Sequence, residues 1–146
     1  MNRRLLTAVS RAHVAVFRLS SGRVAGRIAG GAPVLLLTTT GRKSGMQRTT
    51  PLLYLEDGGR YVVVASVGGA PKHPAWYLNL LANPSVTIDV GRRKLAVTAS
   101  TAPTEERARL WPLLVRMYRG YADYQAKTTR KIPVVILAPR IDEIAM

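Results

Sequence analysis

A turn rich in glycine and basic residues is the first segment whose side-chain types and spacing suit a chemical role. The segment is Gly41-Arg42-Lys43-Ser44-Gly45, and Arg48 follows it. The glycines allow backbone N–H groups to face a ligand, while Ser44 adds a hydroxyl donor and the three cations add charge. The spacing of a nucleotide-binding P-loop is absent. The pattern indicates an anion-binding turn, or else an ordinary basic hairpin tip.

A second candidate lies where a predicted strand ends and a short helix begins. The strand runs into Ala65-Ser66-Val67-Gly68-Gly69, and the helix opens at Pro74. Glycines let a flat ring approach the backbone closely, and the first turn of a helix offers unpaired N–H groups to an anion or a polar ring edge. On that helix Trp76 and Asn79 lie about one turn apart. The segment predicts a ring-binding site. The alternative is that Trp76 is simply a core residue.

Three tyrosines form the third candidate group. Tyr118, Tyr121 and Tyr124 are spaced at i, i+3 and i+6, so they line one side of a helical or turn segment. A phenol combines an apolar ring with a proton donor, which suits contact with an aromatic substrate. The alternative is an aromatic face that caps the protein core.

The composition of the chain limits which partners it could bind and which kinds of catalysis it could carry out. The 146 residues form one domain, and 22 basic against 8 acidic residues give a net charge of +14. Such a charge indicates an acidic partner: nucleic acid, an anionic membrane or a polyanionic small molecule. The absence of cysteine excludes disulfides and thiolate catalysis. No metal site is predicted, because His13 and His73 are isolated in the sequence.

Residues 1–31 differ from the rest of the chain. They contain six arginines and no acid, and Arg4, Arg11 and Arg18 recur opposite an apolar arc between Leu5 and Leu19. This pattern predicts a basic amphipathic helix, with a linker over 26–33. The helix is expected to pack on the core, to lie on anionic lipid or to contact nucleic acid. We therefore divide the chain into residues 1–31 and a domain of residues 32–146.

No stretch is long and apolar enough to span a bilayer, and arginines interrupt any signal-peptide core. The expected location is the cytoplasm, with residues 1–31 as the candidate contact to the inner face of the cell membrane.

The elements that must position these groups are mostly strands. The predicted strands cover 34–40, 48–56, 60–66, 85–90, 94–100 and 132–138. The predicted helices cover 74–82 and 104–119, and a turn followed by a helix is predicted over 118–127. Pro51 indicates an edge or bulge, Pro74 suits a first helical turn and Thr104 suits an N-cap. Short turns between strands predict a mainly antiparallel sheet of the α+β, mainly β class, closing as a small barrel.

Together these motifs resemble the deazaflavin (F420)-dependent nitroreductase family, the F420H2-dependent reductases of actinobacteria. The resemblance spans about residues 33–139 in one order. It rests on the run from Leu35 to Gly45, on Arg48, Pro51-Leu52, Asp57-Gly58-Gly59, Ala65-Ser66 and Gly68-Gly69, and on Pro74, Trp76-Tyr77-Leu78-Asn79-Leu80 and Ala82-Asn83-Pro84. It continues through Glu105-Glu106-Arg107-Ala108, Trp111-Pro112, Met117-Tyr118, Tyr121, Asp123-Tyr124-Gln125 and Ile132-Pro133. It implies a split β-barrel that binds coenzyme F420.

The resemblance also implies roles for individual residues. The implied cofactor contacts are Arg42, Lys43, Ser44 and Arg48 at the phosphate and acidic tail, Ala65, Ser66, Gly68 and Gly69 beside the deazaflavin ring, and Trp76 and Asn79 at the ring or its side chain. The implied catalytic contacts are Tyr118, Tyr121, Tyr124 and Ser66. Val67 and Leu53 depart from a nitroimidazole-activating relative, which carries Lys and Tyr at these positions, and so bear on the identity of the acceptor.

The expected activity is transfer of a hydride from reduced F420 to an electron-poor acceptor, such as a quinone (menaquinone among them) or a nitroaromatic. Two alternatives remain: an FMN-binding split-barrel oxidoreductase, and a non-enzymatic protein of the same fold that binds fatty acid or lipid. Nucleic acid is not an expected partner, because the arginines are spread along the chain and no recognition motif appears.

Overall fold

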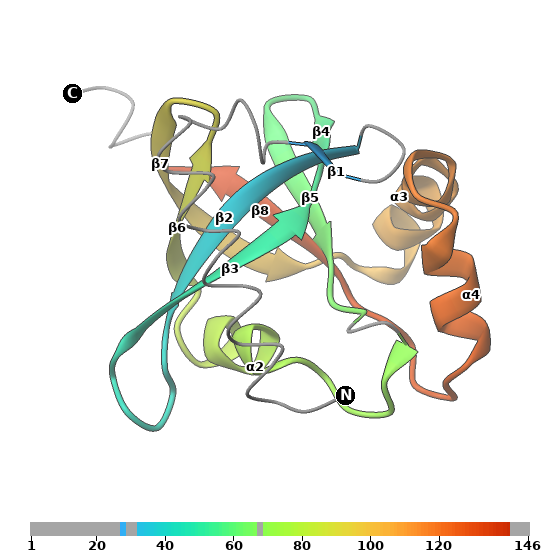
Figure 1. Ribbon diagram of the computed structural model, residues 1–146, viewed down its shortest axis with the longest axis horizontal. Helices are drawn as coiled ribbons and strands as arrows, with labels where there is room; N and C mark the ends of the chain where they lie inside the picture. The colour runs from blue at the N-terminus through green and yellow to red at the C-terminus, as the bar shows by residue number, and fades with distance from the viewer. Residues whose placement is uncertain (1–26, 29–31, 67–68, 141–146) are drawn as a thin grey trace.

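A curled antiparallel sheet with three helices around it makes up the described part of the chain (Figure 1). The computed structural model describes residues 27–28, 32–66 and 69–140. The strands are β1 (Arg27–Ile28), β2 (Ala32–Thr40), β3 (Gln47–Leu53), β4 (Leu55–Asp57), β5 (Arg60–Val64), β6 (Ser85–Val90), β7 (Arg93–Thr101) and β8 (Val134–Pro139). The helices are α2 (Ala75–Ala82), α3 (Thr104–Met117) and α4 (Gly120–Ala126).

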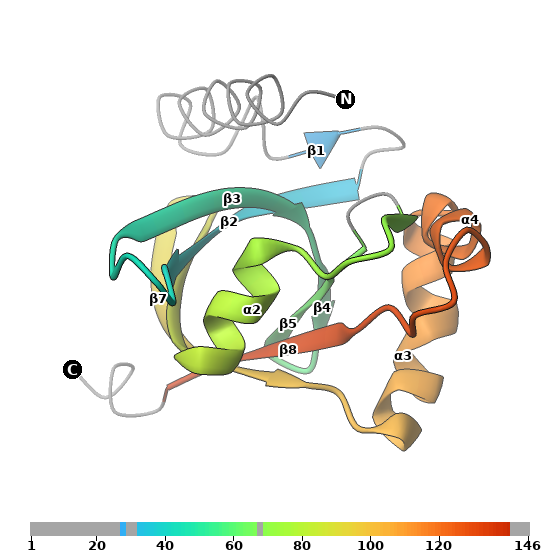
Figure 2. The ribbon, with the colours of Figure 1, turned by 90° about the horizontal axis from the view of Figure 1, so that it is seen from below.

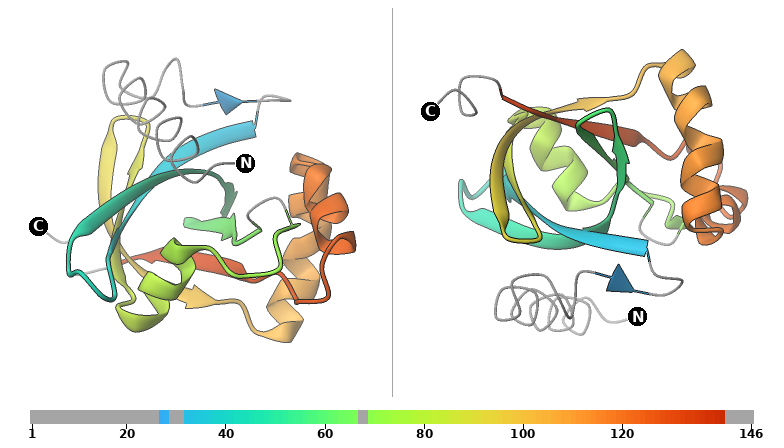
Figure 3. Two further views of the ribbon diagram at one scale, coloured as in Figure 1. Left: turned by 60° about the horizontal axis from the view of Figure 1, so that its bottom comes forward. Right: turned by 90° about the horizontal axis from the view of Figure 1, so that it is seen from above.

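The order of the strands confirms the predicted mainly antiparallel barrel. The sheet runs β1-β2-β6-β7-β8-β5-β4, with β3 paired to β2, and every pairing in it is antiparallel. The last strand, β8, returns between β7 and β5. Seen from above, the strands curl around an interior filled by core side chains, with α2 closing the far end (Figure 3, right).

The predicted single strand over 48–56 is wrong in one respect, because the structure divides it at Tyr54. The part before the break, β3, pairs with β2, whereas the part after it, β4, pairs with β5. At the break the Tyr54 N–H donates to the carbonyl of Pro33 at 3.1 Å. One continuous segment therefore connects two separate ends of the sheet and helps to close the barrel. Pro51 lies in β3, which pairs only with β2 in the described chain, as expected for proline at an edge.

Alternation along β5 explains why its run of β-branched residues suits a strand buried on both faces. Tyr61 and Val63 point into the barrel, where they join the first core cluster. Val62 and Val64 point outward, where they pack beneath α3 and α4 in the second cluster. Successive residues of a strand face opposite sides of a sheet, so a strand between two cores must be apolar at every position.

The helices agree with the predicted positions but differ at their first residues. Pro74 and Pro103 take the N-cap positions of α2 and α3, so Pro74 lies one residue before the first turn and Thr104 is the first helical residue instead of the cap. Extended backbone at the cap suits proline, whose φ is fixed near the observed values. In the described residues no helix has the length and apolar character needed to cross a membrane.

The predicted linker over 26–33 is also wrong in part. Arg27 and Ile28 form β1, which pairs with Pro33 and Ala32 at the start of β2. The sheet therefore extends into the segment that composition alone indicated as a linker. The predicted basic helix of residues 1–31 otherwise lies outside the described residues.

An ion-pair cluster fixes the β4–β5 hairpin against α3. The Asp57 carboxylate accepts hydrogen bonds from Nη1 and Nη2 of Arg109, at 3.1 and 2.8 Å, and from Nη2 of Arg60 at 2.9 Å. Hydrogen bonds from Arg109 and then Arg60 lower the pKa of Asp57 from 3.8 to about 2. A carboxyl group whose pKa is lower in the folded than in the unfolded state stabilises the fold at pH values above the unfolded-state pKa. That stabilisation is lost as the pH falls through the folded-state pKa.

We therefore expect part of the stability to disappear as the pH falls from 3.8 toward 2. Urea unfolding of the wild type and of Asp57→Asn measures it. The variant should be less stable at neutral pH, and most of the difference should be lost by about pH 2. A difference that stays constant over this range would show that the Asp57 charge contributes nothing to stability.

Candidate active site

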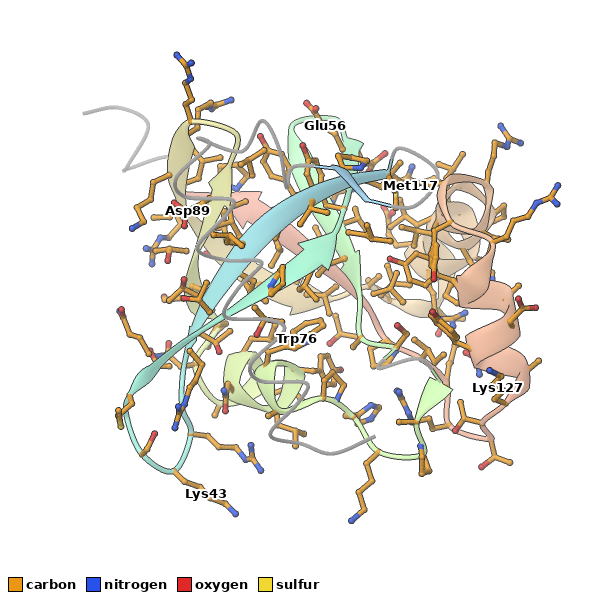
Figure 4. The ribbon with its side chains drawn as sticks, in the orientation of Figure 1. Lys43, Glu56, Trp76, Asp89, Met117 and Lys127 are labelled. Carbon is orange, nitrogen blue, oxygen red and sulfur yellow. The ribbon has the colours of Figure 1, made fainter. Side chains whose placement is uncertain are left out.

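The three groups of candidate residues lie along one face of the barrel. Figure 2 looks at this face and shows the β2–β3 turn, α2, the connection that leads into α2 and α4 arranged across it. Figure 4 labels a residue from each region: Lys43 in the turn, Trp76 on α2 and Lys127 at the end of α4. The fold thus brings together segments that are far apart in the sequence.

The β2–β3 turn is held in shape by its own backbone. The Gly41 N–H donates to the Met46 carbonyl at 2.7 Å, and the Gly45 N–H donates to the Gly41 carbonyl at 2.8 Å. A Cβ at Gly41 would lie 2.6 Å from the Ser44 hydroxyl oxygen and 3.1 Å from the Met46 carbonyl oxygen, so glycine lets the two sides of the turn approach closely. The Ser44 hydroxyl accepts the Met46 N–H at 3.1 Å and supports the turn internally.

The cations of this turn are available to a ligand. Arg42, Lys43 and Arg48 are all exposed. Within the described residues their charged groups take part in none of the ion pairs, which involve only Arg60 and Arg109. The turn and the start of β3, where Arg48 lies, therefore offer three positive charges outside the ion pairs of the described residues, as an anion-binding site requires.

Asn79 connects the turn to α2. It is 5% exposed, and both ends of its amide are used within the protein. Its Oδ1 accepts the backbone N–H of Arg42 at 3.1 Å, and its Nδ2 donates to the Thr39 hydroxyl at 3.2 Å. Asn79 therefore positions the basic turn, a role that its helical spacing from Trp76 did not indicate.

Trp76 lies at the end of the barrel interior. It is 8% exposed, belongs to the first core cluster and contacts Tyr77 edge to face, with ring centroids 6.3 Å apart. This location fits the core alternative considered for Trp76.

The connection from β5 to α2 packs against α4. Ser66 is 9% exposed, and its carbonyl accepts the Gly69 N–H at 3.0 Å. Gly69 has a φ of 82°, and a Cβ there would lie 2.6 Å from the Tyr124 carbonyl oxygen. The absence of a side chain at Gly69 therefore allows the connection to pack closely against the α4 backbone. Val67 and Gly68 lie outside the described residues.

Arg130 is a residue of this region that the sequence reasoning missed. It follows α4 in the chain, and its guanidinium donates to carbonyl groups of the β5–α2 connection. No motif or periodicity points to it, because it lies within a short basic segment that resembles an ordinary surface loop.

The tyrosines form a cluster in which two hydroxyl groups meet. Tyr118 and Tyr124 share a hydrogen bond of 2.8 Å between their hydroxyl oxygens. Tyr121 is 5% exposed and packs in the second core cluster, with its ring 5.0 Å from that of Tyr118. The hydrogen bond from Tyr118, followed by burial, raises the pKa of Tyr124 to about 12, and burial raises the pKa of Tyr121 further. Tyr121 and Tyr124 are therefore protonated donors at neutral pH.

Comparison with known proteins identifies the family. A sequence model of the F420H2-dependent quinone reductases matches residues 9–139. The chain belongs to this family. It is 46% identical over 133 residues to an F420H2-dependent quinone reductase of Mycobacterium tuberculosis, covering 89% of both chains. The family makes it an F420H2-dependent oxidoreductase and confirms the resemblance noted in the sequence.

Solved structures agree with this assignment. An F420H2-dependent reductase named FDR-A is 50% identical, with a TM-score of 0.67 over 72% of this chain and 93% of that one. The heme storage protein HutZ from Vibrio cholerae is 14% identical, with a TM-score of 0.56 over 88% and 89% of the two chains. The second likeness concerns the fold alone. The split β-barrel expected for this chain is thus confirmed.

The side chains of this chain fit the family's cofactor, coenzyme F420. The exposed cations of the basic turn suit the anionic groups of that cofactor, and Asn79 holds the turn in place. No group of three or more metal-binding side chains occurs among the described residues. The family favours F420 over the FMN and lipid-binding alternatives.

Proposed function

We propose that this chain reduces a lipid-dissolved quinone such as menaquinone, using F420H2 bound across the face that carries the basic turn, α2 and α4. The family match is the observation that carries the proposal. In this assignment Arg42, Lys43, Ser44 and Arg48 hold the anionic part of the cofactor. The connection after β5, with Ala65, Ser66, Gly68 and Gly69, lies beside the ring, and Trp76 borders it.

The protein contributes binding, orientation and protons to this reaction. Bound reduced F420 supplies a hydride, and the quinone accepts that hydride and one proton to become a hydroquinone. The chain holds ring and quinone in contact, so that an encounter of two molecules becomes a reaction within one complex. Close packing of the connection against α4 supports this arrangement.

We propose that the Tyr118–Tyr124 pair donates the proton that the quinone takes up. Its two hydroxyl groups are joined at 2.8 Å, so a proton that leaves one hydroxyl can be replaced through the other from solvent. With its pKa raised to about 12, Tyr124 stays protonated at neutral pH, so its hydroxyl can donate a hydrogen bond to a quinone oxygen and cannot act as a base. We place Tyr121 behind the pair as a packing residue, because it is buried in the second core cluster.

Removing the two hydroxyl groups should slow quinone reduction. For the double variant Tyr118→Phe, Tyr124→Phe we expect kcat/KM for a quinone to fall roughly 100-fold, which is the lower end of the usual contribution of a positioned proton donor. The Kd for F420 should be unchanged. Steady-state kinetics and a binding titration measure both quantities.

Tyr61→Phe is the matched control, because Tyr61 is a buried tyrosine of the barrel interior. It should retain wild-type kinetics. Wild-type kcat/KM in the double variant would remove the pair from the mechanism while leaving the F420 assignment intact.

We also propose that residues 1–31 bring the protein to the inner face of the cell membrane, where a lipid-dissolved quinone is found. Support comes from the six arginines and the apolar arc in this segment. The full chain should pellet with anionic liposomes, and a chain lacking residues 1–26 should not. Equal pelleting of the two proteins would refute this role.

A further inference from the structure

Arg130 binds three carbonyl groups of the connection between β5 and α2. Its Nε donates to the Ala70 carbonyl at 2.8 Å. Its Nη1 and Nη2 donate to the carbonyls of Ala65 at 3.2 Å and Ser66 at 2.8 Å. One rigid guanidinium thus joins the two ends of the connection and fixes the backbone that carries Ser66.

A fourth contact extends this hold to the start of α2. The Nη1 of Arg130 lies 3.0 Å from Nδ1 of His73. A guanidinium only donates, so Nδ1 must accept, and the imidazole is neutral with its proton on Nε2. Burial and the nearby Arg130 charge lower the pKa of His73, which favours this neutral form. The imidazole also packs edge-on against Tyr77 of α2, with ring centroids 5.0 Å apart.

The backbone of Arg130 is itself held in place. The Gln125 side chain of α4 donates to the Arg130 carbonyl at 2.8 Å, and the Thr128 hydroxyl accepts the Arg130 N–H at 3.3 Å. Arg107 of α3 donates to the other end of the Gln125 amide at 3.1 Å. The guanidinium therefore connects the β5–α2 connection to a network that includes α3 and α4.

We propose that Arg130 is the positioning residue of the active site, holding the β5–α2 connection in the shape that receives the F420 ring. The inference rests on the proposed function, which places Ala65 and Ser66 beside that ring. Arg130 acts through the carbonyl groups it binds and is not itself a catalytic residue. Only the planar fork of an arginine bonds several carbonyls in fixed directions, so lysine cannot replace it.

Loss of the guanidinium should impair cofactor binding and turnover more than it impairs folding. For Arg130→Ala we expect the Kd for F420 to rise at least roughly 10-fold and kcat to fall by a similar factor, with circular dichroism showing a folded protein. Arg130→Lys should keep the charge without restoring either value. Arg109→Ala is the control for removing an arginine, because Arg109 pairs with Asp57 and Glu106 and binds no part of the connection.

Chemical rescue separates positioning from general stability. Guanidinium at non-denaturing concentration should restore part of both F420 binding and kcat in Arg130→Ala, whereas sodium at the same ionic strength should not. A folded Arg130→Ala that binds F420 and turns over like the wild type would overturn the proposal. So would a loss of activity that only follows the unfolded fraction and that guanidinium does not reverse.

A second readout needs no cofactor. The chain has two histidines, so an NMR titration can follow His73 after His13→Gln removes the other signal. The described groups that face His73 are Arg130 and Tyr77. The pKa of His73 should lie below 6.5 in the wild type and rise in Arg130→Ala. An unchanged pKa would contradict the Arg130 contact, whereas a wild-type enzyme inactive toward F420H2 would refute the proposed function itself.

Discussion

Neutralising the cations of the β2–β3 turn should weaken F420 binding roughly 100-fold. The variant is Arg42→Gln, Lys43→Gln, Arg48→Gln. These side chains are exposed and outside the ion pairs of the described residues, so their charges are free for an anionic ligand. If each contact is worth about 1 kcal/mol in an exposed site, the three together contribute about 3 kcal/mol, or roughly two powers of ten in Kd. A fluorescence titration with F420 measures the change.

A second basic turn provides the matched control. Arg92 lies between β6 and β7, and Arg93 and Lys94 are the first residues of β7. All three are exposed, and this hairpin is at the opposite end of the sheet from the β2–β3 turn (Figure 1). Changing all three to Gln removes the same charge. The control variant should bind F420 like the wild type, and only the wild type and control should lose affinity steeply with added salt. Equal weakening in both variants would mean that net charge alone, without a specific turn, attracts the cofactor.

Replacing Gly69 by Ala should strongly destabilise the contact between the β5–α2 connection and α4. The new Cβ would lie 2.6 Å from the Tyr124 carbonyl oxygen and 2.9 Å from its Cα, and backbone atoms cannot move aside as a flexible side chain can. The position also has a φ of 82°, which disfavours any side chain. Together these effects should cost about 3 kcal/mol, or roughly 10 °C in Tm for a chain of this size.

Gly59 separates the two causes of that loss. Its φ of 85° is close to that of Gly69, but a Cβ there would meet nothing within 4 Å. Gly59→Ala therefore carries only the conformational cost of about 1 kcal/mol and should lower Tm by roughly 3 °C. Thermal unfolding of the two variants is the measurement. Equal Tm values would show that the connection does not pack against Tyr124 as described.

The general fold could be predicted because its signals are local. Alternation, turn residues and short connections located six strands and the helices, and the run of β-branched residues in β5 reflects burial on both faces. The break at Tyr54 could not be predicted, since it depends on pairing with Pro33 and on two different partner strands. The pairing of Arg27 and Ile28 with β2 is hidden for the same reason.

The candidate site shows the same division between local and distant causes. The residue types of the basic turn and the spacing of the tyrosines are local features, so both groups could be predicted as candidate site residues from the sequence. The bonds made by Asn79 reach residues 37 and 40 positions away, and those of Arg130 reach residues 57 to 65 positions away. No local pattern encodes such contacts, so one chain cannot predict which polar residue positions the site.

The roles proposed for the basic turn, the β5–α2 connection and the tyrosine pair all depend on hydride transfer from F420H2 to a quinone. The most direct test is anaerobic oxidation of F420H2 by the full chain with a water-soluble menaquinone analogue, followed through the absorbance of F420, with reduced FMN and a nitroaromatic in parallel. We predict saturable, quinone-dependent oxidation of F420H2, little reaction with reduced FMN and a slower rate in the Tyr118→Phe, Tyr124→Phe variant. F420H2 oxidation no faster than in the enzyme-free control, or activity only with reduced FMN, would contradict the account.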